Sequence, residues 1–547
     1  MKYYILFIFC SISIQAQTYE GTIGKHRIFL ELDIDYNDDR ATAFYFYKSQ
    51  LQNIQLEGSF SNNELVLFEK FSDIKEQKEL FTLIINKDTI AGTWKNKGKT
   101  LQVDLNKTTK KIDDYKLMNL EYARDSITIH NTKELVWFTE KYSKKSLFRL
   151  GNGFTSSERE FMNPKLDTIH ANYATIGLDC GWADINIEME LISNQYISFT
   201  EYSSIYCGGA HPNHNMVGYN FDFKNKKQLD RITDLYPNLD HFQLLKRKYE
   251  NDTDFDDECG YFTDGEWIWE YYSWVLTKNG ITITPSYPHA MTPCEIGFPL
   301  TYKELLETDS SKKVIQATID SVSISEIKQY SEEFPTIFDY YKYEKIDKVD
   351  VWSDKMFGRC CSNTDLTFNE NLFFKIDSNF NDNRYPISNL SDTRYSTAYV
   401  FKPGAKVKIN LQLDLSSDKS FLSGKYSNKN LLKPNDLIMK PIKLSVINGY
   451  VKSKALFYQN ARVKEMKVYV NNIYKETVIL LDTPLVQQFE VDAVFKTNDT
   501  ITLEPITFYK GSKYDDICIS EIQTNLGRIA VSELNKKHNL MELINKN

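Results

Sequence analysis

The chain of 547 residues is long enough for roughly three or four domains. An apolar content of 41% excludes a disordered protein, and an aromatic content of 14% favours half-buried β structure. The net charge of -8, without a basic stripe, argues against nucleic acid or an anionic lipid surface as the main partner.

Residues 1–16 predict a signal peptide. Lys2 supplies a basic start, an apolar run follows over residues 3–14, and Ala16 is a small residue suited to cleavage before Gln17. The run is too short to span a bilayer, and no later stretch approaches the roughly 20 apolar residues of a membrane span. We therefore expect an exported protein, periplasmic or secreted, that is not membrane-spanning.

Residues 17–110 predict a small all-β domain. Between Ile28 and Ile34 aliphatic residues alternate with acidic ones, which places the aliphatic set on one face of a strand. Further short strands are expected at 42–47, 54–60, 64–69, 80–85, 89–94 and 101–105, separated by turn residues such as those at 61–63 and 86–88. Seven short strands at this spacing indicate a meander that closes into a barrel or folds as a sandwich.

Residues 115–310 predict an α+β domain. Alternation over 184–191 indicates a half-buried strand, and 196–206 is its expected hairpin partner. We expect short helices at 133–142 and at 239–249, the second with Asn238 as its N-cap. A hairpin is expected at 274–284 around Asn279-Gly280. Residues 311–350 follow as a helical linker, 351–525 return to short strands, and 526–547 form a tail.

The central region carries a motif that resembles a known family. Residues 206–213 read Tyr-Cys-Gly-Gly-Ala-His-Pro-Asn, followed by Tyr-Asn-Phe-Asp at 219–222 and Ile-Thr-Asp-Leu-Tyr at 232–236. In this order they resemble the extracellular domain of sigma-V anti-sigma factors, the membrane sensors of lysozyme, and of peptidoglycan deacetylases. The resemblance covers roughly residues 120–308 and implies a cell-wall component or a lysozyme-like protein as partner.

The C-terminal region carries a second resemblance. Asn-Leu-Ser-Asp at 389–392, Ile-Asn-Gly-Tyr at 447–450, Asn-Ala-Arg-Val-Lys at 460–464 and Ile-Ser-Glu-Ile at 519–522 resemble the glycan-binding, discoidin-like (F5/8 type C) domain found beside secreted NAD glycohydrolases. The family implies a jelly-roll β-sandwich of the galactose-binding-like type over 351–525. Two positions depart from the family: Ser391-Asp392 replaces its Asp-Gly, and Tyr399 replaces the Trp of its Thr-Ala-Trp. The NAD-cleaving enzyme itself is absent.

The second resemblance nominates Tyr399, Tyr450 and Arg462 as ligand-binding residues of the sandwich. Tyrosine can stack on a sugar in place of tryptophan. Arg462 lies in a strand-like stretch, where two interpretations stay open: a side chain that points into a ligand groove, or a packed, hydrogen-bonded structural arginine.

The loop after Tyr206 is the sharpest local feature of the central region. Gly208 and Gly209 permit a tight turn, and Pro212 fixes its exit. Three interpretations stay open for the side chains that the loop presents: a recognition loop, a structural turn whose imidazoles satisfy backbone groups, or a zinc site that includes Cys207. No fourth zinc ligand can be assigned, and a disulfide explains Cys207 better. The residues presented are Tyr206, His211, Asn213 and His214.

Signal-peptide cleavage leaves seven cysteines, so at least one thiol has no partner within the chain. A two-residue turn at Ser193-Asn194 pairs residues that sum to 387 and places Cys180 opposite Cys207. The apolar faces of the two strands instead need a three-residue loop and a register shifted by one residue, unless a bulge reconciles the two. We expect Cys180–Cys207 first and Cys259–Cys294 next. In discoidin-like domains the first and last strands lie together, which implies Cys518 with Cys360 or Cys361.

The leading hypothesis is a multidomain, mainly β, exported binding protein without catalytic activity or a cofactor. Its expected partner is a glycan, peptidoglycan or another cell-wall component, or a cell-wall-degrading protein such as lysozyme. The sequence contains no G-x-S-x-G elbow, P-loop, H-E-x-x-H or dinucleotide fingerprint. The alternative is a metal-dependent hydrolase of cell-wall material with its site at His211 and His214.

Overall fold

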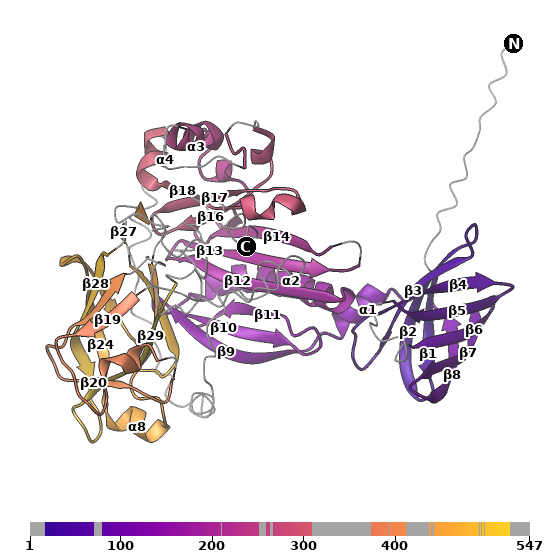
Figure 1. Ribbon diagram of the computed structural model, residues 1–547, viewed down its shortest axis with the longest axis horizontal. Coiled ribbons are helices and arrows are strands. Elements are labelled where there is room, and N and C mark those ends of the chain that lie inside the picture. Colours follow the sequence, from indigo (N-terminus) through magenta and orange to yellow (C-terminus); the bar gives the residue numbers. More distant parts are fainter. Residues whose placement is uncertain are drawn as a thin grey trace, which may run out of the picture.

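The computed structural model describes residues 17–70, 79–208, 211–250, 259–262, 266–308, 374–392, 394–411, 437–438, 442–491, 493, 495–496 and 498–525. The predicted signal peptide, the linker 311–350 and the tail 526–547 lie outside these residues. The described part is mainly β, as the sequence predicts (Figure 1). No helix in the described part is both long and apolar enough to cross a membrane.

The N-terminal strands form a closed barrel, in which β1 pairs with β8. Inward residues such as Leu30, Leu67 and Leu83 alternate along their strands with more exposed ones, which confirms the predicted period-two pattern. The sequence predicted seven of the strands, and the eighth, β1, closes the barrel. The strands are β1 (Gln17–Ile23), β2 (His26–Asp35), β3 (Arg40–Tyr47), β4 (Ile54–Ser61), β5 (Glu64–Glu69), β6 (Leu80–Asn86), β7 (Thr89–Asn96) and β8 (Lys99–Lys107).

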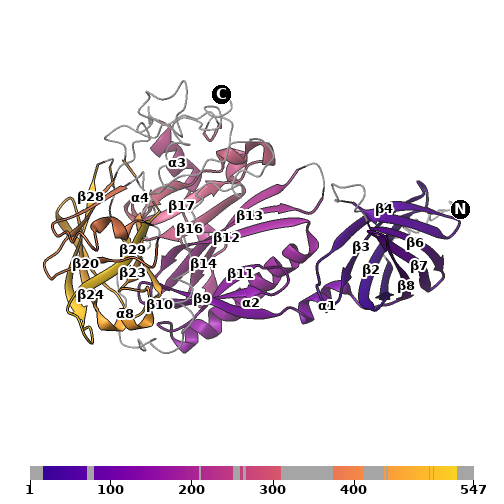
Figure 2. The same ribbon diagram turned by 60° about the horizontal axis from the view of Figure 1, so that its bottom comes forward.

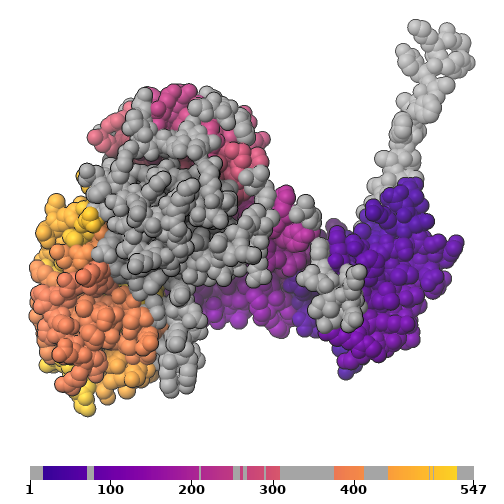
Figure 3. Space-filling view, in the orientation of Figure 1, coloured from indigo at the N-terminus to yellow at the C-terminus, as the bar shows by residue number. Residues whose placement is uncertain are grey.

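The barrel stands to one side of the rest of the chain (Figure 3), and α1 (Ile112–Met118) lies at the junction (Figure 1). Outward-facing Phe29 and Phe46 pack with Ile112 of α1 and with Leu178. The ammonium group of Lys116, whose side chain is fully buried, lies 4.8 Å from the centroid of the Phe46 ring. Aromatic faces attract cations, so the junction combines apolar packing with a held positive charge.

The central region stacks a three-stranded arm, a long helix and a second sheet around one core. Helix α2 (Ser156–Asp179) begins at a capping box, in which Thr155 accepts from the Glu158 backbone N–H and Glu158 accepts from that of Thr155. The sequence analysis did not predict this helix. The arm contains β9 (Tyr122–His130), β10 (Lys133–Glu140) and β11 (Ser146–Leu150), and the second sheet contains β12 (Trp182–Ile192), β13 (Tyr196–Tyr206), β14 (Asn213–Asp222) and β15 (Lys227–Gln228).

The prediction of a helix at 133–142 was wrong, because β10 pairs with β9 on one side and β11 on the other. Tertiary pairing on both edges overrides the local helix preference of Lys133-Glu134-Leu135. The predicted second helix is present as α3 (His241–Tyr249). Its N-cap is Asp240, whose side chain accepts from the Gln243 N–H at 3.0 Å, and not Asn238.

A small sheet covers one end of β12–β14 on the side away from α2. Its first two strands are the predicted hairpin, with Lys278 and Asn279 in the turn. A hypothetical Cβ on Gly218 would lie 2.0 Å from the carbonyl oxygen of Trp274, so glycine is needed for this close approach of β14 and β16. The remaining central elements are η2 (Ile232–Asp234), η3 (Glu266–Trp269), β16 (Tyr272–Thr277), β17 (Gly280–Pro285), η4 (His289–Cys294), β18 (Phe298–Thr301) and α4 (Tyr302–Thr308).

Both predicted central disulfides are present, Cys180–Cys207 and Cys259–Cys294. The register deduced from a two-residue turn was wrong: Trp182 pairs with Tyr206, so paired residues sum to 388 and not 387. A bulge between Met189 and Leu191 then shifts the register further in the same direction. Cys180, at the end of α2, reaches Cys207 although the two are not directly opposite in the ladder.

The C-terminal strands enclose one apolar core that includes Leu444, Val468, Ile501 and Ile519. Strand β24 connects the two sides of this sandwich: it runs antiparallel to β28 and, at Ala461 and Arg462, parallel to β29. The elements are β19 (Phe374–Ser378), η6 (Ile387–Leu390), β20 (Tyr399–Phe401), β21 (Val407–Leu411), β22 (Leu437–Ile438), β23 (Ile442–Asn448), α8 (Lys454–Gln459), β24 (Ala461–Val470), β25 (Ile473–Ile479), β26 (Val486–Val491), β27 (Phe495–Lys496), β28 (Thr500–Tyr509) and β29 (Ile517–Thr524).

The central arm and the sandwich share one sheet (Figure 2). Strand β9 pairs in parallel with β26, with Ile129 opposite Gln487. Nearby, the ammonium group of Lys443 on β23 donates to the carbonyl oxygen of Met189 and lies 3.3 Å from the Glu188 carboxylate. The sequence places these strands in separate domains, yet backbone pairing and an ion pair join them.

Candidate functional site

The loop between β13 and β14 presents the residues predicted for recognition. His211 and Asn213 are exposed, and Nδ1 of His211 lies 3.0 Å from the carbonyl oxygen of Pro212. Asn213 is the first residue of β14, and the next residue, His214, pairs with Ser204 across the ladder. Gly208 has a φ of 103°, where glycine is favoured. The loop is therefore a hairpin tip that displays polar side chains.

The proposed zinc ligand Cys207 is not available as a thiolate, because its sulfur is bonded to that of Cys180. Within the residues that the structure describes, no group of three or more His, Cys, Asp and Glu side chains is arranged to hold a metal ion. The geometry gives the hydrolase alternative no support at His211 and His214.

Below the tip, the face of the sheet that points away from α2 carries a mixed aromatic and polar row. Trp182 pairs with Tyr206, and the next row on this face places Asp184, Ser204 and His214 side by side on three strands. The Trp182 side chain is exposed, whereas Ser204 is buried. Aromatic faces beside hydroxyl, carboxylate and imidazole groups form a surface that suits a polar ligand with an apolar face.

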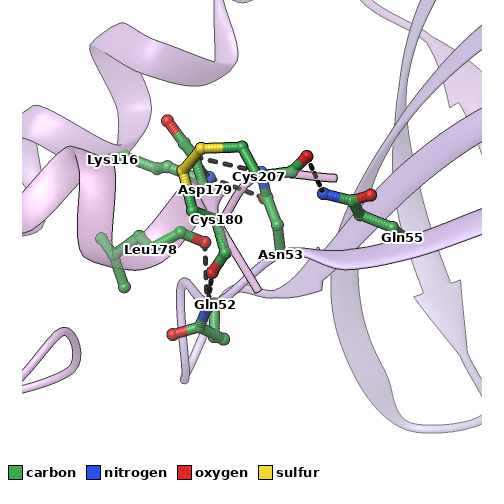
Figure 4. Close-up of a disulfide and its surroundings, with 8 residues drawn as sticks. All are labelled: Gln52, Asn53, Gln55, Lys116, Leu178, Asp179, Cys180 and Cys207. Carbon is green, nitrogen blue, oxygen red and sulfur yellow. Dashed lines mark hydrogen bonds and ion pairs between the residues drawn. A yellow bond between two sulfur atoms is a disulfide. The ribbon is translucent and has the colours of Figure 1, made fainter. Parts of the chain in front are cut away.

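The Cys180–Cys207 disulfide, at the start of this tip, is fastened to the barrel (Figure 4). The Gln55 side chain donates to the carbonyl oxygen of Cys207 at 3.4 Å, and the Asn53 backbone N–H donates to that of Leu178 at 2.8 Å. Asp179 accepts hydrogen bonds from Asn53 and from Lys116. The last turn of α2 thus obtains a cation and donors from the barrel side, as helix C-termini require.

Two residues nominated for glycan binding have structural roles in the sandwich. Tyr399 is fully buried and stacks on Phe401, and its hydroxyl lies 2.7 Å from both the Phe380 carbonyl oxygen, which accepts from it, and the Ser378 hydroxyl. It has no ring face for a sugar, so this nomination was wrong. Arg462 is also buried, which decides between its two interpretations in favour of the structural one.

The contacts of Arg462 organise the loops at one end of the sandwich. Its guanidinium group forms two hydrogen bonds with the Asp482 carboxylate, at 2.9 and 2.6 Å, and donates to the carbonyl oxygens of Asn460 and Lys510. The rings of Phe457 and Tyr458 in α8 lie 5.1 and 5.8 Å from its central carbon. One buried cation therefore fixes α8 and the 510–516 loop together.

Tyr450 lies among these loops and remains a candidate ligand-binding residue. It is half-buried, its ring centroid lies 6.1 Å from that of Tyr385, and burial raises the pKa of its hydroxyl. The preceding Gly449 has a φ of 85°, and a Cβ there would lie 2.7 Å from the Phe457 ring. Glycine is therefore needed at position 449, where the chain passes close to the Phe457 ring of α8.

Sequence reasoning missed three further aromatic residues of this end: Tyr385, Tyr458 and Tyr514. The Tyr514 backbone N–H donates to the Gln459 carbonyl at 2.8 Å, and its side chain is 41% exposed. Gly511 permits this close approach, because a Cβ there would lie 2.5 Å from the same carbonyl oxygen. Only the aromatic composition of the loops could have indicated these residues in the sequence, because side chains in loops do not recur at the regular spacing of a helix or a strand. We call Tyr385, Tyr450, Tyr458 and Tyr514 the α8 cluster; α8 itself lies at the end of the sandwich in Figures 1 and 2.

Comparison with known proteins bears on this C-terminal part. Residues 435–525 match the family model described as the NAD glycohydrolase translocation F5/8 type C domain. These residues contribute Tyr450, Tyr458 and Tyr514 of the α8 cluster. Among solved structures, the family 32 CBM from C. perfringens NanJ, in complex with galactose, matches with 11% identity and a TM-score of 0.19, covering 28% of this chain and 92% of that chain. No curated protein matches the chain.

The matched residues confirm the discoidin-like resemblance for 435–525 and lie entirely C-terminal of the central region. The resemblance of residues 120–308 to the sigma-V anti-sigma extracellular domain stays a prediction. Cys518, predicted to bridge to Cys360 or Cys361, is a free, buried thiol, and burial raises its pKa to about 12, so it is unreactive. Both predicted partners lie outside the described residues.

Proposed function

We propose that the protein is an exported, non-catalytic binding protein that recognises a glycan through the α8 cluster. The match of residues 435–525 to an F5/8 type C family carries the proposal. The cluster adds the chemistry: tyrosine rings combine a flat apolar face, which covers the C–H face of a sugar, with a hydroxyl that forms hydrogen bonds. Two disulfides support an oxidising compartment, and therefore export.

The central region offers a second, weaker surface for the same target. The β13–β14 tip and the sheet below it provide exposed aromatic and polar side chains, namely Trp182, His211 and Asn213. We propose a cell-wall component or a cell-wall-degrading protein such as lysozyme as the partner of this surface. Because strand pairing joins the central region to the sandwich, both surfaces are held on one scaffold, and two weak contacts then gain avidity.

A glycan array with the chain from Gln17 onward tests the proposal. We expect binding to a subset of glycans that is lost in Tyr450→Ala and Tyr514→Ala. Tyr474→Ala is the matched control, because Tyr474 is 52% exposed but follows the far end of β24, away from α8. Binding that survives both α8 variants, or that falls equally in the control, contradicts the proposal, as does failure to bind any glycan on the array.

A further inference from the structure

Two buried polar atoms at one mouth of the barrel have no hydrogen-bond partner. They are the indole Nε1 of Trp94 and the side-chain Oδ1 of Asn96, both on β7. A buried donor or acceptor without a partner is costly, and native proteins satisfy nearly all of them. Two such atoms of opposite hydrogen-bonding character on one strand therefore point to a ligand that both accepts and donates.

The strand geometry aims both side chains into the lumen. Residues two apart face the same side of a strand, and Ile90 and Trp94 belong to the barrel core. Asn96 continues this inward row to the end of β7. It pairs with Lys99 across the turn Lys97-Gly98, whose φ values of 48° and 77° are those of a tight two-residue hairpin. The position of Asn96 at the mouth is thereby fixed.

Aromatic and acidic residues lie at the same end of the barrel as the two atoms. Phe81 pairs with Trp94, so continuing the same register brings Glu79 opposite Asn96. The Tyr45 hydroxyl donates to the Glu79 carboxylate. The Tyr45 ring meets Phe81 edge-to-face at 5.3 Å, across the lumen from β3 to β6, and Tyr47 at 5.5 Å. We call Tyr45, Tyr47, Glu79, Trp94 and Asn96 the barrel mouth.

We propose that the barrel mouth binds a saccharide, with one hydroxyl accepting from Trp94 Nε1 and donating to Asn96 Oδ1. A hydroxyl group can do both, because it carries one O–H donor and two acceptor lone pairs. Tyr47, which is half-buried and ends β3, supplies an aromatic ring to pack against the C–H face of the sugar. The Glu79 carboxylate accepts from a neighbouring hydroxyl, as it already does from Tyr45.

Other ligand chemistries fit the barrel mouth less well. An ammonium group would suit the aromatic rings and Glu79, but it cannot accept from the indole N–H. A carboxylate or phosphate would accept from the indole, but it cannot donate to Asn96 when ionised, and the Glu79 carboxylate would repel it. A purely apolar ligand would leave both polar atoms unsatisfied. A neutral ring that carries hydroxyl groups is the ligand class that can satisfy the indole donor, the amide acceptor and the Glu79 carboxylate together.

This site is separate from the α8 cluster and does not depend on the function proposed for it. It assigns a ligand to the N-terminal barrel, which lies outside the residues that match the F5/8 type C family. The two proposals can therefore fail independently, and the experiment is designed to keep them apart.

The test is ¹⁹F NMR of the chain from Gln17 onward, labelled with 5-fluorotryptophan. The chain has seven tryptophans, and Trp94→Phe identifies the Trp94 signal by its loss. The titrants are glucose, galactose, N-acetylglucosamine and their β-linked disaccharides, with choline chloride as the cationic probe. We expect at least one saccharide to shift the Trp94 signal saturably, and Asn96→Leu, which removes the acceptor, to weaken that binding about tenfold.

Trp137→Phe is the matched control, because it removes a half-buried tryptophan of β10, outside the barrel, and should leave the Trp94 titration unchanged. No shift of the Trp94 signal with any saccharide overturns the proposal, and so does a shift with choline alone. The titration of the unmutated chain is decisive even if Asn96→Leu fails to fold. Array binding without a Trp94 shift refutes only the barrel site, whereas a Trp94 shift in a protein that binds nothing through Tyr514 refutes only the α8 site.

Discussion

Replacing Arg462 with methionine separates a structural arginine from a ligand-binding one. Methionine keeps much of the side-chain volume but removes the charge and all five donors. The variant leaves the Asp482 carboxylate, whose side chain is only 20% exposed, without its cation, and it takes a donor from the Asn460 and Lys510 carbonyls. Breaking a buried ion pair by removing one partner costs about 3–5 kcal/mol.

We therefore expect Arg462→Met to lower the free energy of unfolding of the sandwich by about 3–5 kcal/mol, which corresponds to a fall in Tm of roughly 6–20 °C for a unit of this size. Urea unfolding followed by circular dichroism measures it. Adding Asp482→Leu should recover part of the loss, because the unpaired carboxylate is then gone. The reasoning is refuted if Arg462→Met unfolds within about 1 kcal/mol of the unmutated protein yet loses glycan binding, because a surface ligand contact would behave that way.

Three further predictions concern the central region. The Cys180→Ala, Cys207→Ala double variant removes a cross-link between cysteines 27 residues apart and should cost about 3.6 kcal/mol of stability by the loop-entropy relation; unchanged urea unfolding under non-reducing conditions would speak against it. His170 is fully buried, and burial, opposed by a hydrogen bond to a backbone carbonyl, lowers its pKa to about 4. The unfolded chain takes up this proton near pH 6.5, so stability should fall by about 3 kcal/mol as the pH drops from 6.5 to 4, and His170→Asn should flatten that slope; an equal slope in the variant would contradict the assignment. Lys443→Met removes the cation that β23 places against two glutamates of β12, and should cost about 3 kcal/mol, with increased proteolysis between the second central sheet and the sandwich; equal protease resistance would show that this ion pair does not secure their junction.

The barrel was largely predictable because its information is local. Alternation marks the strands from β2 to β8, and turn residues such as Asn62 and Asn63, both at positive φ, mark the β4–β5 hairpin. Only β1 was missed, because it adjoins the predicted signal peptide and its alternation is interrupted by Gly21. The Cys180–Cys207 pair was predicted correctly from an incorrect register. A disulfide can join cysteines that are diagonal neighbours on two strands, so its presence does not fix the strand register.

What was missed depends on partners distant in sequence. Residues 133–140 became a strand because β9 and β11 flank them, and β9 joins β26 across more than 350 positions of the chain. Tyr399 and Tyr450 were equally plausible ligand-binding residues from the sequence. In the structure Tyr399 is a buried stacking residue, whereas Tyr450 lies among the loops. Burial of an aromatic side chain is decided by tertiary packing and not by its residue type. The members of the α8 cluster could therefore be identified only from the structure.

A crystal structure of the protein with the best glycan from the array would test glycan recognition at the α8 cluster most directly. We predict a sugar ring against Tyr450 or Tyr514, with Arg462 behind the loops and out of contact with it. A sugar bound only at the β13–β14 tip or the barrel mouth, or direct contact between the sugar and the Arg462 guanidinium, would contradict the assignment of the α8 cluster as the glycan site.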